Sequence, residues 1–185
     1  MSGLSMSGLS MSALPMAFVT EALCLTLFPA MMAFAASSDF LTMTIANRVS
    51  IILIGGFIVL AVMTGMSGVE MLSHAGAGAA VLAGAFVCFA FGWIGGGDAK
   101  LAAVTALWLG FGHLADYLVY ASLLGGVLTI VIIQFRALPL PQLFVGREWA
   151  ERLHRLGGGV PYGIALAASA LLVYPHTEWM RAAGL

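Results

Sequence analysis

Residues 99–135 read AKLAAVTALWLGFGHLADYLVYASLLGGVLTIVIIQF, and this long apolar stretch decides how many helices the chain can form. At about 1.5 Å per residue, a single helix over these residues would measure about 55 Å. The hydrocarbon core of a bilayer is only about 30 Å thick. The stretch therefore has to fold back on itself, and we expect the turn at His113–Asp116, the most polar part of the run.

The composition of the whole chain indicates a protein embedded in a membrane. Of its 185 residues, 62% are hydrophobic and only 8% are charged. A soluble domain carries about 25% charged residues, so this chain could not cover itself with polar surface. Three further apolar runs have about the length of a span, Met16–Ala36, Val49–Met66 and Gly76–Ile94, and a shorter run, Val160–Tyr174, is the candidate for the last one. We therefore expect an all-α membrane bundle of about six transmembrane helices.

The ends of the chain and its cysteines add little chemistry. Residues 1–15, MSGLSMSGLSMSALP, form a degenerate repeat that we expect to be a disordered tail, before a helical domain at 16–175 and a short tail at 176–185. Cys24 and Cys88 lie far apart in apolar runs, which favours buried small side chains over a metal site. The net charge of −1 points to no nucleic-acid partner. We expect membrane lipid around the chain, and no metal or cofactor.

Basic residues predict which side of the membrane each connection faces. The connections after the first, third and fifth spans share one side, and they hold six of the seven basic residues: Arg48, Lys100, Arg136, Arg147, Arg152 and Arg155. By the positive-inside rule that side is cytoplasmic, and both termini lie outside with Arg181. The segment GREWAERLHRL (146–156) places Glu148 and Glu151 each four residues before an arginine, which favours a short surface helix.

Acidic residues within apolar runs are the candidate functional groups, because ionisable side chains at membrane depth are costly. Five residues fall near the outer ends of spans, where we expect solvation: Glu21, Glu70, His74, His113 and Asp116. Asp39 and Asp98 instead both fall at the cytoplasmic boundary. If they lie close together they would share a proton, so that one activates a water and the other polarises a carbonyl group. The alternative is two interfacial acids that never meet.

Three motifs resemble one known family. GGGDAKL (95–101) matches a GxGDxK signature, DFLTMTIAN (39–47) places an asparagine eight residues after an aspartate, and GGVPYGIALAASALL (158–172) begins a last helix with PYG. Together, and in this order, they resemble the type IV prepilin peptidases, which are membrane aspartyl proteases of the GxGD class. The resemblance covers roughly residues 20–174. The chain departs from the family where basic residues and a proline are usual, with Phe40, Leu41, Thr42 and Ala46.

The resemblance implies a function and a set of site residues. Asp39 and Asp98 would be the catalytic dyad, Gly95 and Gly97 would give access to Asp98, and Lys100 and Asn47 would support the site. The substrate would be a prepilin, cleaved after a glycine at the cytoplasmic face of the inner membrane.

The subtype and the alternatives follow from length and from the cysteines. Full-size members of the family carry a further domain with four cysteines and also methylate the pilin. With two cysteines in 185 residues, the chain resembles the small, peptidase-only branch linked to tight-adherence (Flp) pili. We therefore expect cleavage without methylation. An archaeal preflagellin peptidase, with the same dyad, and a non-catalytic membrane assembly or transport subunit remain alternatives.

Overall fold

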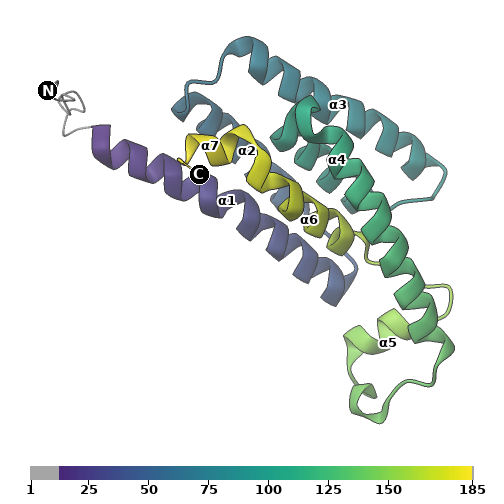
Figure 1. Ribbon diagram of the computed structural model, residues 1–185. Helices are drawn as coiled ribbons and strands as arrows, with labels where there is room; N and C mark the ends of the chain where they lie inside the picture. The colour runs from purple at the N-terminus through teal and green to yellow at the C-terminus, as the bar shows by residue number, and fades with distance from the viewer. Residues whose placement is uncertain (1–12, 185) are drawn as a thin grey trace, which may run out of the picture.

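The computed structural model describes residues 13–184, and the regular structure of these residues is entirely helical (Figure 1). The helices are α1 (Ala13–Thr42), α2 (Asn47–Met63), α3 (Gly68–Ala90), α4 (Gly96–Ala137), α5 (Glu148–His154), α6 (Tyr162–Val173) and α7 (Glu178–Ala182), with short 3-10 turns at Gln142–Phe144 and Tyr174–His176. The expected all-α class is confirmed. The predicted disordered tail falls largely on residues 1–12, outside the described part of the chain.

Among residues 13–184, three helices are long and apolar enough to cross a membrane: Met16–Thr42, Gly68–Ala90 and Gly96–Ala137. Two shorter apolar helices, Asn47–Met63 and Tyr162–His176, accompany them. The structure therefore supports a membrane protein with several apolar helices, without establishing six spans. The third predicted span also begins earlier than expected, because α3 starts at Gly68 with a reciprocal cap between Ser67 and Glu70. Glu70 and His74 thus lie on α3, not in a loop as expected.

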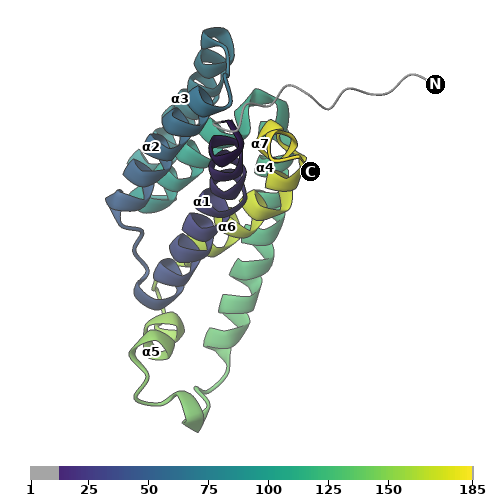
Figure 2. The same cartoon turned by 90° about the vertical axis from the view of Figure 1, so that its left-hand side faces the viewer.

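Helix α4 reverses direction at Gly110, not at His113–Asp116 as the sequence suggested. Gly110 has φ 65° and ψ 179°, a left-handed conformation that strongly favours glycine. Figures 1 and 2 show that α4 folds back on itself. The polar residues at 113–116 remain helical, with Asp116 exposed on the surface. The position of the reversal is therefore determined by the residue that can adopt a positive φ, and not by local polarity.

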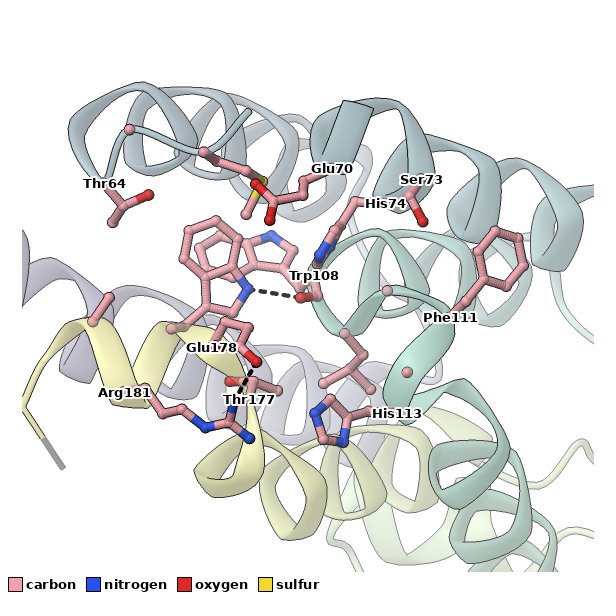
Figure 3. A pocket seen from close by; sticks show the side chains of 17 residues that line it. Thr64, Glu70, Ser73, His74, Trp108, Phe111, His113, Thr177, Glu178 and Arg181 are labelled. Atoms are coloured by element: carbon pink, nitrogen blue, oxygen red, sulfur yellow. Dashed lines mark hydrogen bonds and ion pairs between the residues drawn. The ribbon is translucent and has the colours of Figure 1, made fainter. Parts of the chain in front are cut away.

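Side chains from two other helices hold this break together (Figure 3). A helix end leaves the carbonyl groups of its last turn without partners. Nδ1 of His74 donates to the carbonyl oxygen of Leu107 over 2.8 Å, and Nε1 of Trp179 donates to that of Trp108 over 2.7 Å. The His74 ring also lies where a side chain on Gly110 would be, 2.9 Å from an ideal Cβ. Helices α3 and α7 therefore stabilise the reversal.

The core of the bundle is aromatic and centres on Trp108, which is fully buried. Phe28, Tyr174 and Trp179 pack around it with ring centroids between 5.1 and 6.3 Å away. Nε1 of Trp108 donates to the carbonyl of Leu53, and Nε1 of Trp179 and the hydroxyl of Tyr174 also donate to backbone carbonyls. Helix α6 lies between α1 and α4 (Figure 1), which brings the end of α1 and the start of α6 together.

Helix α5 lies beyond the main bundle, beside the end of α1 (Figures 1 and 2). The predicted short surface helix is confirmed, but its expected ion pairs with Arg152 and Arg155 do not form. The carboxylate of Glu151 instead accepts from the backbone N–H of Gly146, and Arg152 donates to the carbonyl of Leu41 at the end of α1. These exposed charged side chains therefore bind free backbone groups of the neighbouring turns, and not one another.

Candidate active site

Asp39 lies in the last turn of α1 and is almost completely buried, with 4% of its surface exposed. The backbone N–H of Gly163, in the first turn of α6, donates to its Oδ2 over 2.7 Å. Helix α1 ends at Thr42, and the next residue, Met43, takes φ 53° and donates to the carbonyl of Asp39. The carboxylate is therefore held between the end of one helix and the start of another.

Asp98 lies in the first turn of α4, after the N-cap residue Gly95. An ideal Cβ on Gly95 would be 3.1 Å from Oδ2 of Asp98, so the carboxylate lies directly against the glycine backbone. Asp98 is half-buried, and its neighbour Gly97 lies against Ile45, which also lies against Gly163, the residue that binds Asp39. The two aspartates that the sequence singled out thus come from separate helices and lie near one another at one end of the bundle.

Ile45 fills the space between the two glycines that flank this pair. An ideal Cβ on Gly97 would be 3.2 Å from Cβ of Ile45, and one on Gly163 would be 2.8 Å from its Cδ1. Ile45 lies in the short connection between α1 and α2. Sequence reasoning missed both Ile45 and Gly163. The PYG motif was a signal for Gly163, but nothing in the sequence marked Ile45.

Lys100 and Asn47 meet on the exposed side of the same region. Nζ of Lys100 donates to Oδ1 of Asn47 over 2.8 Å, which joins the first turn of α4 to the first residue of α2. The Asn47 side chain does not cap α2, because the N-cap position is Ala46 and has no side-chain cap. The six residues selected from the sequence therefore gather at one end of the bundle.

A cavity of about 590 Å³ opens at the opposite end, around the break in α4 (Figure 3). Its polar lining includes Glu70, His74, His113, Glu178 and Arg181. Glu178 and Arg181 pair with each other, and residues 13–184 contain no group of three side chains able to hold a metal ion. None of the six residues selected from the sequence lines this cavity, so it lies apart from the aspartates.

Two neighbouring carboxylates beside side-chain-free backbone are suited to acid–base chemistry on a peptide bond. The comparisons with known proteins agree with this chemistry. Residues 26–130, more than half of the chain, match the model of the type IV leader peptidase family. The matched range contains the GGGDAK motif and both aspartates. No curated protein and no solved structure gave a significant match.

Proposed function

Because the chain belongs to the type IV leader peptidase family, and so is an aspartic-type prepilin leader peptidase of the inner membrane, we propose that it processes Flp-type prepilins. It cuts after the glycine that ends the leader, at the cytoplasmic face, and leaves the new amino group unmethylated. The observation that carries this proposal is that Asp39 and Asp98 come from the ends of separate helices and meet around Ile45 at one end of the bundle.

Asp39 and Asp98 act together on one water molecule. The ionised carboxylate takes a proton from the water, while the protonated one transfers its proton to the oxygen of the scissile carbonyl. The water oxygen bonds to the carbonyl carbon and gives a tetrahedral diol. The carbon–nitrogen bond then breaks: the carboxyl that took the water proton gives it to the leaving amine, and one hydroxyl of the diol returns its proton to the other carboxylate, which leaves the carboxyl product and restores the pair. Two neighbouring acids that share one proton provide the acid and the base at the same pH.

The glycines and the polar pair support this chemistry from either side. Gly95 leaves room for the Asp98 carboxylate, and Gly97 leaves room for Ile45, because a Cβ on either glycine would meet these groups within 3.2 Å. The Lys100–Asn47 hydrogen bond fixes the start of α2 against α4, and thereby the connection that carries Ile45. These residues set the approach to the dyad.

The short connections favour cleavage without methylation. Only residues 43–46 join α1 to α2, and no connection within residues 13–184 is long enough for a further folded domain. Cys24 lies in α1 and Cys88 lies in α3, both as free thiols. Within these residues nothing could form the four-cysteine domain that accompanies methylation.

Co-expression with a candidate Flp prepilin tests the proposal. Asp39→Asn and Asp98→Asn should each reduce processing at least 100-fold, and the double variant should be no worse, because residues that act as one unit lose activity non-additively. Processing is measured by the electrophoretic mobility shift, normalised to enzyme level, and mass spectrometry of the mature pilin reports methylation.

Asp116→Asn provides the matched control, since Asp116 is an exposed acid on the same helix as Asp98. It should process prepilin at the wild-type rate. Substantial processing by either single variant of the dyad would contradict the proposed mechanism. A methylated pilin terminus, made with this enzyme alone, would contradict the proposed subtype.

A further inference from the structure

The first residues of α6 connect the aspartate pair to the second half of α4. The N–H of Gly163 holds Asp39, and the preceding residue, Tyr162, points its ring into α4. The ring occupies a notch formed by Gly125 and Thr129, which lie one turn apart. An ideal Cβ on Gly125 would be 2.7 Å from Cε1 of Tyr162, closer than real contacts allow. Only glycine leaves room for the ring.

Two hydrogen bonds fix the position of the ring in this notch. The hydroxyl groups of Tyr162 and Thr129 lie 2.9 Å apart and share a hydrogen bond. Oγ1 of Thr129 also donates to the carbonyl of Gly125 over 2.7 Å, so the notch is held by its own helix. The Tyr162 hydroxyl therefore donates to a Thr129 oxygen whose own proton is already engaged. Ring shape and hydrogen bonding together determine where the start of α6 lies.

We propose that Tyr162 is a positioning residue for the dyad, which acts on Asp39 through the N–H of Gly163. This role rests on the proposed function of Asp39 and extends it to a residue that touches neither the substrate nor the reacting atoms. One rigid peptide unit joins Tyr162 to the N–H that holds the carboxylate. A displacement of the Tyr162 ring therefore also shifts the N–H of Gly163, and with it the position of Oδ2 of Asp39.

Steric reasoning sets the size of the expected effect. A methyl group on Gly125 would have to move the Tyr162 ring by roughly 1 Å to reach an ordinary contact distance. Gly163 cannot absorb this shift, because ideal Cβ contacts of 2.8 Å to both Asp39 and Ile45 show how tightly its surroundings are packed. Misplacement of a catalytic group by about 1 Å can reduce turnover by about 100-fold.

Gly125→Ala is the direct test, and Gly126→Ala is its matched control. Gly126 is the neighbouring residue on the same helix, and an added Cβ there would meet nothing within 4 Å. With purified enzyme and a prepilin-derived substrate, Gly125→Ala should lower kcat by about 10- to 100-fold and change KM by less than about twofold. Gly126→Ala should match the wild type in both constants.

Removal of the crowded atom should restore activity. Leucine lacks the Cε1 atom that meets the added methyl group, so Gly125→Ala combined with Tyr162→Leu should turn over faster than Gly125→Ala alone. Tyr162→Phe and Thr129→Val provide milder variants if Gly125→Ala accumulates poorly. Each removes one hydroxyl from the same hydrogen bond, so each should lower kcat by a similar factor of about 2 to 5, and the double variant should be no worse.

Three results would overturn this role for Tyr162. They are an unchanged kcat in Gly125→Ala, an equal loss in Gly126→Ala, and an effect of the hydroxyl variants on KM alone. The Asp39→Asn variant separates this failure from failure of the proposed function. If Asp39→Asn is inactive while Gly125→Ala is normal, only the role of Tyr162 is wrong. If Asp39→Asn still cleaves, the catalytic assignment itself is wrong.

Discussion

Gly97 lies between Asp98 and Ile45, where one added methyl group would change the spacing of the candidate site. An ideal Cβ there would be 3.2 Å from Cβ of Ile45, so the connection between α1 and α2 would have to move by a few tenths of an ångström. We expect Gly97→Ala to slow prepilin processing by about three- to tenfold without abolishing it, because the carboxylates remain and only their spacing changes.

Gly96→Ala is the matched control for this change. Its added Cβ would lie 3.4 Å from the Phe89 ring, an ordinary contact, so processing should stay within about twofold of the wild type. The processed fraction of prepilin is followed over time and normalised to enzyme level. Complete loss of processing in Gly97→Ala at normal enzyme level would show that Gly97 does more than provide space.

Individual site residues could be selected from the sequence only where they belong to a recognisable motif. Asp39, Asp98, Lys100 and Asn47 belong to spaced patterns, and the structure gathers them at one end of the bundle. The hydrogen bond from Gly163 to Asp39 joins residues 124 positions apart, and no local pattern encodes such a pairing. Long-range backbone contacts of this kind can be identified only from the three-dimensional structure.

At the scale of elements, length predicted that residues 99–135 reverse, but polarity misplaced the reversal. A polar residue such as Asp116 can stay helical when it is exposed on the surface, so the segment His113–Asp116 is compatible with an uninterrupted helix. Gly110 carries the positive φ, and His74 and Trp179 supply donors to the freed carbonyls. Two of these three contributions come from other helices, and the sequence of the run alone could not show them.

Gly110→Ala should destabilise the protein through this break. The substitution puts a side chain into a left-handed conformation and places a Cβ 2.9 Å from the His74 ring. We expect a loss of about 1–3 kcal/mol, which corresponds to a decrease in Tm of roughly 3–10 °C for a chain of this size. Thermal unfolding in detergent measures it. Gly112→Ala, which meets nothing within 4 Å, should leave Tm nearly unchanged. Equal Tm values for the two variants would contradict this account of the break.

At the scale of the whole molecule, basic side chains concentrate at the end that carries the aspartates. Lys100 binds Asn47, Arg152 binds the carbonyl of Leu41, and Arg136 donates to the carbonyls of Gly158 and Gly159. Arg181 lines the cavity at the opposite end. The charge asymmetry expected from the sequence therefore corresponds to two ends of one bundle.

This asymmetry predicts the orientation of the protein in the inner membrane. Positive residues beside spans are retained on the cytoplasmic side, so the end that holds Lys100, Arg136 and Arg152 should face the cytoplasm. Reporter domains inserted at 64–67, between α2 and α3, should report the outside, and those inserted at 142–147, before α5, should report the cytoplasm. Each insertion is checked for retained prepilin processing, so that only folded protein is scored. A cytoplasmic signal from 64–67 in an active variant would place Asp39 and Asp98 on the wrong side for a cytoplasmic leader, and would contradict the proposed site of cleavage.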